Sequence, residues 1–522
     1  TFSGVISGTN GNIVKAGSGT LTLSDANTYT GTTTINAGDL TVSGSLHDDT
    51  AVSIASGADY NVNASDTVAS IEGAGNIVLA SGQTLTAGDG NDKTLSGVMS
   101  GAGNYIKAGG GTQTLSASNT YTGTTQVSAG TLTVSGSGRL SDSTAVTVDS
   151  GATYNVAVTD TVASIAGAGS ITLGSNTLTS GGSNANTTFS GVISGSNGNL
   201  IKAGSGTLTL TGNNSYTGST TISAGLLKII RDDPTSYLAA TSGFTGPGNL
   251  TIESSGDDFT ADIVTGTHVQ LAGTALGNLI IGKTGNTRQI DLSSDITTTG
   301  TQTYNGPVRL VGGDRTVSTT NSNVIFASTV NSDGTQRALT VTNGTGDTTF
   351  SGAIGGSAPV KSLTITSDQL TAGAMTLNGA LTAIVANASS ITGVIADGGG
   401  GTASLVKAGN GTLTLSASNT YTGTTAINAG DLTVSGSLHD DTAVSIASGA
   451  DYNVNASDTV ASIEGAGDIV LASSQTLTAG DGNNKTFSGV MSGAGNYIKV
   501  GSGTLTLSGS NTYTGTTAIN AG

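Results

Sequence analysis

The chain has 522 residues, too many for one compact hydrophobic core, so it forms either several domains or one elongated array of repeats. Acidic residues outnumber basic ones by 33 to 16, and the net charge of −17 argues against nucleic acid or an anionic membrane surface as a partner. There is no cysteine, which suits a chain that crosses a membrane unfolded, and no apolar run reaches the length of a membrane-spanning helix, about 18 residues.

One phrase, KAGSGTLTLSDANTYTGTTTINAG, begins at Lys15 and returns along the chain. We call it the short repeat. Its five copies are Lys15–Gly38, Lys107–Gly130, Lys202–Gly225, Lys407–Gly430 and Lys499–Gly522. Repetition of this kind predicts a stack of similar units, each of which buries its apolar face against its neighbours. We therefore expect the short repeat to be scaffold, and its tyrosines to be packing or capping elements of one recurring coil.

The secondary structure is predicted from an alternation of apolar and small polar residues. In Thr20–Ser24 the leucines face one way and the hydroxyls the other, and Leu40–Val42 and Ala51–Ile54 repeat the pattern. The runs are short and are bounded by Gly, Asn and Asp, which reach positive φ easily. Although there are 82 glycines, the alternation supplies a buried face that disordered chains lack.

Short strands, small-residue turns and an open-ended repeat predict an all-β chain that folds as a right-handed parallel β-helix, a single elongated solenoid. Coils of about 20–25 residues would give roughly two dozen coils, each about 4.8 Å from the next. Leu, Ile and Val would form ladders inside, and asparagines in the turns would form amide ladders.

The short repeat belongs to a longer module, because Tyr29, Tyr121 and Tyr216 recur at intervals of 92 and 95 residues. Residues 423–498 repeat residues 31–106 with five differences, namely Thr34/Ala426, Asn76/Asp468, Gly82/Ser474, Asp92/Asn484 and Leu95/Phe487. We divide the sequence into modules in 1–225, a divergent segment without the short repeat in 226–346, and returning modules in 347–522. Both ends fall inside a repeat, so we expect the sequence to be part of a longer protein.

The divergent segment is where we expect a binding surface, if the chain carries one. It contains most of the prolines and arginines, and we expect it to remain β-helical with a loop at Arg231–Pro234. The alternative is that it is only a diverged structural stretch. The candidate partner-binding residues are Arg231, His268, Arg288, Arg309, Arg315 and Arg337.

Catalytic and metal chemistry find little support. His47 stands beside Asp48 and Asp49, with a copy at His439, but neighbouring residues point in different directions and no third ligand is near in sequence, so we expect a solvated turn. The pairs Asp232–Asp233 and Asp257–Asp258 raise the question of a polysaccharide hydrolase or lyase, which needs several carboxylates converging on one groove. We predict no catalytic residue, no cofactor-binding residue and no metal-binding residue.

Calcium at Asp-Gly turns is a weaker alternative. The candidate turn is Ala87–Asp92, which contains Asp89, and its copy at Ala479–Asn484 contains Asp481 but has lost one carboxylate. Neither turn has the full ligand pattern of a known calcium loop, so we expect an ordinary turn and no cofactor.

The consensus K-A-G-x-G-T-L-T-L-x-x-x-N-x-Y-T-G-x-T-x-I-x-A-G resembles the passenger-associated repeat of bacterial autotransporters. Within the divergent segment, TQTYNG from Thr301 and the following PVRLVGGDRTV resemble a motif of filamentous-haemagglutinin-like β-helices. The first resemblance implies a parallel β-helix, export through a C-terminal translocation barrel that these residues do not include, and surface or secreted roles such as adhesion.

On this basis we expect a non-enzymatic structural and adhesive shaft, located outside the cell or on the bacterial surface. Its partners would be a host or neighbouring-cell surface, or further copies of itself, with no nucleic acid and with membrane contact only through the barrel. Two alternatives stay open: a self-assembling filament, sheath or biofilm-matrix protein, and a β-helical polysaccharide hydrolase or lyase.

Overall fold

A computed structural model of the chain describes residues 1–234, 243–271 and 276–522. In these ranges every regular element is a β-strand, and the strands pair in parallel. The predicted all-β parallel solenoid is thereby confirmed, with about 25 turns; its right-handed winding stays a prediction. The described part of the chain contains no helix that could cross a membrane.

The chain divides into two compact units. Among the described residues, the first unit comprises Thr1–Arg231 and residues 243–251, and the second comprises residues 232–234 and Ile252–Gly522. The boundary between them falls inside the divergent segment. The three-part division of the sequence into modules and a divergent segment stays a prediction.

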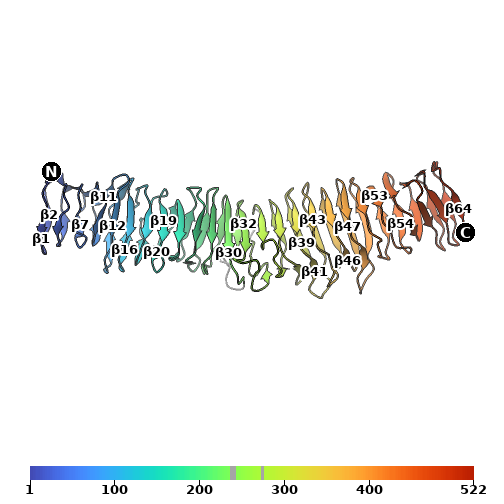
Figure 1. Ribbon diagram of the computed structural model, residues 1–522, viewed down its shortest axis with the longest axis horizontal. Coiled ribbons are helices and arrows are strands. Elements are labelled where there is room, and N and C mark those ends of the chain that lie inside the picture. Colours follow the sequence, from blue (N-terminus) through green and yellow to red (C-terminus); the bar gives the residue numbers. More distant parts are fainter. Residues whose placement is uncertain (235–242, 272–275) are drawn as a thin grey trace. The chain divides into compact units, whose positions relative to one another are not determined.

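In the first unit each coil places its strands over those of the preceding coil (Figure 1). Ile35 pairs with Ile54, and Ile54 with Gly73, so a coil here takes 19 residues. Gly73 has φ of +115°, and a Cβ atom on it would lie 2.1 Å from the carbonyl oxygen of Ile54, so only glycine permits this close approach between coils.

Two faces of the first unit carry the residues discussed below. One stacks β2 (Ile13–Lys15), β5 (Thr33–Ile35), β7 (Ala51–Ile54), β10 (Ser70–Gly73), β13 (Lys93–Leu95), β16 (Thr112–Leu115), β18 (Thr131–Val134), β20 (Thr153–Val156), β23 (Ser170–Thr172) and β26 (Val192–Ser194). Another stacks β9 (Asp66–Val68), β12 (Thr84–Ala87), β15 (Asn104–Lys107), β17 (Thr125–Val127), β19 (Ala145–Val148), β22 (Ser164–Gly167), β25 (Thr187–Phe189), β28 (Thr207–Leu210) and β30 (Leu226–Ile230).

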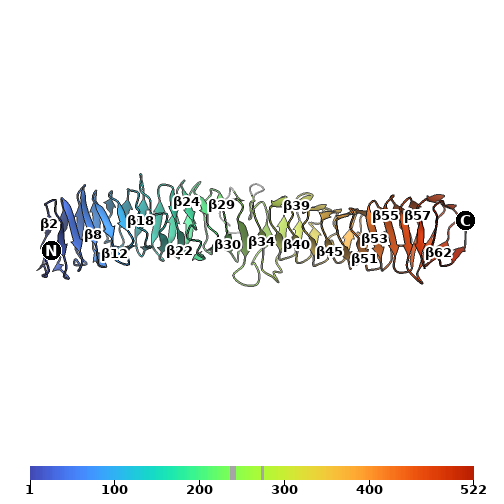
Figure 2. The ribbon, with the colours of Figure 1, turned by 90° about the horizontal axis from the view of Figure 1, so that it is seen from above.

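The second unit has the same construction, and the ribbon turned by 90° shows its strands stacked in chain order (Figure 2). One face stacks β33 (Ile263–Val264), β35 (Ile290–Leu292), β38 (Val308–Leu310) and β41 (Val330–Ser332). Another stacks β36 (Ile296–Thr298), β39 (Arg315–Thr319), β42 (Leu339–Thr342), β44 (Leu363–Ser367), β47 (Ala380–Val385), β50 (Ser404–Ala408), β52 (Thr425–Ile427), β54 (Ala443–Ile446), β57 (Ser462–Gly465), β60 (Lys485–Phe487) and β63 (Leu505–Leu507). A third, near the end of the chain, stacks β56 (Asp458–Val460), β59 (Thr476–Ala479), β62 (Asn496–Lys499) and β64 (Thr517–Ile519).

The interior is built from residues in period two. In β8 (Ala58–Val62) the first, third and fifth side chains are buried, and the other two are half-buried. In the divergent segment the interior contains an aromatic ladder, in which the ring of Phe326 stacks on Tyr304 at 5.1 Å and on Phe350 at 4.8 Å between centroids. These three residues are register partners on successive coils; Tyr304 and Phe326 lie in the divergent segment, and Phe350 lies just after it.

Candidate functional site

The lysine that opens each short repeat points into the fold. In the second copy, Lys107 is 1% exposed, and its Nζ donates hydrogen bonds to the carbonyl oxygens of Ala108 at 2.5 Å, Gly109 at 2.9 Å and Ala129 at 3.1 Å. Ala108 and Gly109 lie in the turn that follows the lysine, whereas Ala129 lies one coil further on. The ammonium group therefore bonds two neighbouring coils together with all three of its N–H groups.

The same arrangement recurs in the other copies. The equivalent lysines are Lys15, Lys202, Lys407 and Lys499, and each donates to the carbonyl of the alanine in the A-G pair that ends its copy. Burial lowers the pKa of Lys407 to about 8, so its ammonium form still predominates at neutral pH.

The closing glycine of the short repeat explains why the phrase ends as it does. Gly130 has φ of +62°, and a Cβ atom on it would lie 2.4 Å from the carbonyl oxygen of Gly111 in the preceding coil. Any other residue would be strained in this backbone conformation and would collide with that backbone. The glycine thus allows the close approach that brings the Ala129 carbonyl to Lys107.

The asparagine in the middle of the short repeat connects three coils. Asn119 is 4% exposed, and its Oδ1 accepts a hydrogen bond from the backbone N–H of Met99 at 2.9 Å in the preceding coil. Its Nδ2 donates to the carbonyl oxygens of Ala117 at 3.0 Å and of Arg139 at 2.8 Å, the latter in the following coil. These partners are backbone groups, so the expected amide ladder is wrong for this position: the amide satisfies backbone groups where the strands are interrupted.

Asparagines at the same position in the other copies accept from a backbone N–H of the preceding coil in the same way; they are Asn27, Asn214, Asn419 and Asn511.

The tyrosine of the short repeat begins a buried chain of hydroxyls. The hydroxyl of Tyr121 is hydrogen-bonded to Oγ1 of Thr125 at 2.5 Å, which is hydrogen-bonded in turn to Oγ1 of Thr144 at 2.9 Å. Thr144 Oγ1 donates to the carbonyl oxygen of Gly123 at 2.5 Å. Tyr121 is fully buried, so its predicted packing role is confirmed.

A buried carboxylate lies next to the short repeat in three modules. Asp66 accepts hydrogen bonds from the Tyr60 hydroxyl at 2.6 Å and from the backbone N–H of Leu46 at 3.0 Å. Burial raises the pKa of Asp66 to about 6, because the low-dielectric interior disfavours the charged form. Its equivalents Asp160 and Asp458 have the same partners and the same raised pKa, about 6.

The buried residue before His47 is Leu46, whose backbone N–H donates a hydrogen bond to the Asp66 carboxylate. This carboxylate therefore holds the His47 turn in place. The Nδ1 atom of His47 accepts a hydrogen bond from the backbone N–H of Asp49 at 3.2 Å and lies 3.7 Å from its carboxylate. The copy at His439 repeats both contacts. Among the residues that the structure describes, no group of three or more His, Cys, Asp or Glu side chains is arranged to hold a metal ion.

At the candidate calcium turns the oxygen atoms accept hydrogen bonds from the protein. The Asp89 carboxylate accepts from the backbone N–H of Asn91 at 2.7 Å and from its side-chain amide at 3.0 Å, and Asp481 repeats this with Asn483. Asp92 accepts from the backbone N–H of Thr112 at 2.7 Å. Its substitute Asn484 accepts the equivalent bond, so this position functions without a charge.

In the divergent segment two arginines form bidentate ion pairs. Arg309 on β38 donates to both carboxylate oxygens of Asp291 on β35, at 2.8 and 2.6 Å, across two paired strands. Arg337 donates to both oxygens of Asp333 at 3.2 Å and lowers the pKa of that carboxyl to about 2. Both guanidinium groups are therefore engaged within the fold.

The remaining candidates also bond to their own chain. Arg315 donates from Nε to the carbonyl oxygen of Leu292 at 2.9 Å, and Arg288 donates from Nε to that of Phe259 at 3.2 Å. The Nδ1 atom of half-buried His268 accepts from the backbone N–H of Val264 at 3.1 Å. Arg231 is 7% exposed and lies in the first unit, so the six residues do not share one unit.

The paired carboxylates of this segment likewise bond to backbone groups of another coil. Asp258 accepts from the backbone N–H groups of Thr287 and Arg288, both at 3.0 Å, and Asp232 accepts from that of Ser255 at 2.7 Å.

The five short repeats match the model of a known family of sequence repeats. The model of the passenger-associated-transport-repeat matches residues 13–42, 106–134, 200–229, 405–434 and 498–522. The chain carries five passenger-associated transport repeats. Each matched stretch contains the lysine and the asparagine that bond consecutive coils, together with the tyrosine of the same short repeat.

The chain is also 31% identical over 548 residues to the adhesin BmaC autotransporter of Brucella suis biovar 1 (strain 1330), a match that covers 100% of this chain and 13% of that protein. No solved structure matches the chain.

Sequence reasoning missed the roles of the repeat's lysine and asparagine. The signal was available, because a lysine and an asparagine recur at fixed positions in all five copies of a chain with only 16 basic residues.

Proposed function

We propose that this chain is part of the shaft of an autotransporter-like adhesin, displayed on the bacterial surface or secreted, and that it has no enzymatic activity. The observation that supports this is that each transport repeat hydrogen-bonds consecutive coils through Lys107, Asn119 and their equivalents. A stack of coils held in this way resists separation along its axis, which a shaft that holds a binding region away from the cell requires.

The proposed partners are the surface of a host or neighbouring cell, or further copies of the same protein. Arginines of the divergent segment donate hydrogen bonds to groups of their own chain. A partner that binds this segment would therefore contact the folded surface around them. Purified chain added in excess to bacteria that carry the full-length protein distinguishes the cases. Loss of adhesion would support a binding surface within these residues, whereas unchanged adhesion would support a shaft only.

Surface display is tested with an epitope tag inserted in the turn at Gly57 of the full-length protein. Gly57 has φ of +80°, and a Cβ atom on it would have no neighbour within 4 Å, so the turn has open space at this point. We expect antibody labelling of intact bacteria, with a tagged cytoplasmic protein labelled only after permeabilisation. Labelling of this chain only after permeabilisation would contradict the proposal.

A further inference from the structure

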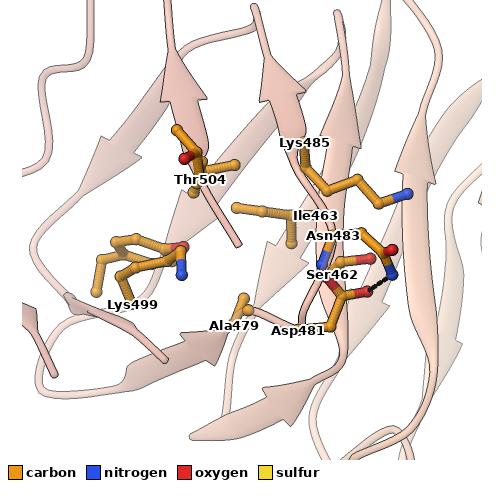
Figure 3. A pocket seen from close by; sticks show the side chains of 11 residues that line it. Ser462, Ile463, Ala479, Asp481, Asn483, Lys485, Lys499 and Thr504 are labelled. Atoms are coloured by element: carbon orange, nitrogen blue, oxygen red, sulfur yellow. Dashed lines mark hydrogen bonds between the residues drawn. The ribbon is translucent and has the colours of Figure 1, made fainter. Parts of the chain in front are cut away.

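An open pocket lies beside the second short repeat, lined by residues 118–122 of one coil and residues 139–143 of the next. Its volume is about 400 Å³, within the range of roughly 300–1,000 Å³ found for pockets that bind small molecules. The cavity beside Lys499 is only about 10 Å³, and its Asp481 carboxylate is hydrogen-bonded to Asn483 (Figure 3). The first pocket has room for a ligand, whereas the second is too small for anything larger than water.

Arg139 is the charged donor that lines the larger pocket. Its side chain is half-buried, and within the described part of the chain it makes one hydrogen bond, from Nη1 to the carbonyl oxygen of Gly138 at 3.4 Å, and no ion pair. Arg309 and Arg337, in contrast, each donate to both oxygens of a carboxylate. Because a guanidinium group carries five N–H donors, most of those of Arg139 remain available to a ligand.

Hydroxyl groups make up most of the other polar lining. The hydroxyls of Thr120, Thr122 and Ser143 are on exposed side chains and make no hydrogen bond to the described residues. Ser141 is 8% exposed, and its Oγ accepts from the backbone N–H of Ser143 at 3.3 Å but donates to no described group. The one apolar side chain of the lining, Leu140, is buried. The pocket thus offers hydrogen bonds in place of apolar contact, which suits a ligand rich in hydroxyl groups.

Two other copies of this corner have the same backbone but no arginine. The residue at the place of Arg139 is Ser45 in the first copy and Ser437 in the later one. In all three copies its carbonyl oxygen accepts a hydrogen bond from the asparagine of the short repeat, at 3.0, 2.8 and 3.0 Å in chain order. The arginine is therefore not needed to build the corner.

The charge of the corner differs in the same way. The first copy has His47, Asp48 and Asp49 after its serine, with two carboxylates and a charge of −2 when the histidine is neutral, and the later copy repeats them. In the second copy, Arg139 and the single carboxylate in residues 141–143 cancel. In a chain with a net charge of −17, this exchange removes the local repulsion of an anion.

Asp142 limits the charge that the pocket can accept. Its exposed side chain lines the same pocket, and it forms no ion pair with Arg139 or with any other described residue. The buried Asp160 also interacts with the charge of Arg139, but its carboxylate accepts hydrogen bonds from Tyr154 and from the backbone N–H of Leu140. A ligand with one negative charge can pair with the guanidinium, whereas a second charge would be repelled by Asp142.

We propose that this pocket binds a saccharide that carries a single carboxylate. The planar guanidinium of Arg139 binds the two carboxylate oxygens side by side, a geometry that an ammonium group cannot match. The hydroxyls of Thr120, Thr122 and Ser141 form hydrogen bonds with the hydroxyls of the sugar ring. The inference rests on the adhesive function proposed above only for the source of the sugar, the surface of another cell.

Titration of the purified chain with methyl β-glucuronide, followed by saturation-transfer-difference NMR, tests the proposal. Methyl β-glucoside is the matched ligand, because it has the same ring with a hydroxymethyl group in place of the carboxylate. We expect the glucuronide to bind and the glucoside to bind at least about tenfold more weakly, since it cannot form the charge-assisted pair. Equal binding of the two sugars, or binding of neither, would overturn the proposal.

Variants of the chain locate the site. Arg139→Ser introduces the residue of the two other copies, so this variant is expected to fold, and it should weaken glucuronide binding at least about tenfold. Thr120→Val should weaken it about two- to tenfold. Lys361→Ser removes an exposed positive charge in the other unit and should leave the affinity unchanged. Equal losses in Arg139→Ser and Lys361→Ser would show attraction by overall charge and would overturn the site.

Two further probes distinguish the class of ligand. A hexaglutamate peptide and inorganic sulfate should each bind at least about tenfold more weakly than the glucuronide, because Asp142 repels added charge and sulfate cannot use the hydroxyl lining. Tighter binding of the peptide would indicate an acidic protein partner, and equal binding of sulfate would indicate a free anion; either result would overturn the saccharide. Because the purified chain is used, a negative result leaves the epitope-tag test of surface display unaffected.

Discussion

Asn76 faces Asp59 across two neighbouring coils, and its Nδ2 donates a hydrogen bond to Oδ1 of Asp59 at 3.1 Å. In the duplicated module the same position is Asp468, which faces Asp451, and Asp451 faces Asp431 on its other side. One of the five differences between the copies therefore replaces a hydrogen bond with a column of three carboxylates.

Asp468→Asn should stabilise the coils around Asp451, by about 0.5 kcal/mol, because like charges in opposed positions of a sheet are destabilising. Burial and the two flanking carboxylates raise the pKa of Asp451. Its unfavourable effect is therefore absent at low pH and grows as the pH rises through that pKa. Amide exchange in residues 450–471 should show slower opening in the variant at pH 7 and little difference at pH 4. Asn76→Asp should accelerate amide exchange in residues 58–79. If neither variant changes exchange, solvent fully screens the repulsion between the facing carboxylates.

The buried carboxylates Asp66, Asp160 and Asp458 predict a second pH dependence. Their pKa is raised from 3.8 to about 6 in the folded chain, so the folded state binds the proton more tightly than the unfolded state. The stabilisation is complete below about pH 4 and is lost as the pH rises through about 6. Urea titration should show a lower midpoint at pH 7 than at pH 5. Asp458→Asn keeps an oxygen acceptor but cannot titrate, so it should reduce the difference between the urea midpoints at pH 5 and pH 7. An unchanged difference would contradict the raised pKa of Asp458.

Lys107→Met should destabilise the coils on either side of the second short repeat, by about 3 kcal/mol. The apolar side chain leaves three carbonyl oxygens in a buried turn without a donor, and each such loss costs about 1–3 kcal/mol before relaxation. Lys361→Met is the control, because Lys361 is 56% exposed and its ion pair with Asp314 at 3.3 Å is a surface one. Local amide exchange around residues 107–130 measures the effect. Equal effects from the two substitutions would show that the lysine serves only as a surface charge.

Gly130→Ala should be strongly destabilising, because its positive φ and the carbonyl of Gly111 leave no room for a Cβ atom. Gly110→Ala is a matched control one coil earlier, since a Cβ atom there meets nothing within 4 Å and its φ is not positive. Thermal unfolding followed by circular dichroism should separate the two by at least about 2 kcal/mol. Similar unfolding temperatures would mean that the coils can separate at this corner without loss.

Period-two alternation and the repeat were sufficient to predict the fold, because a parallel solenoid needs only a buried face in each short strand. The contacts between coils could not be predicted in the same way. A coil takes 19 residues between Ile35 and Ile54 but 22 between Val134 and Val156, so the residue that lies above Asn119 or Lys107 is not fixed by counting.

The arginines show the limit of the same reasoning for the candidate site. Arg309 and Arg337 stand out in sequence because basic residues are rare, and a rare charge at a surface favours a ligand. In the structure their carboxylate partners are Asp291, 18 residues earlier, and Asp333, four residues earlier. Only the register of the coils shows that the first pair meets, so whether this surface binds a partner stays a prediction.

In the second transport repeat one asparagine, Asn119, bonds three consecutive coils together. Amide hydrogen exchange of Asn119→Ala tests this role most directly, with Asn155→Ala as the control, since Asn155 makes a single half-buried side-chain bond to Thr133 at 3.4 Å. We predict exchange at least about tenfold faster in all three coils, at Met99, at Asn119 and at Arg139, and little change in the control. Acceleration confined to the coil of Asn119, or no greater than in the control, would contradict the account.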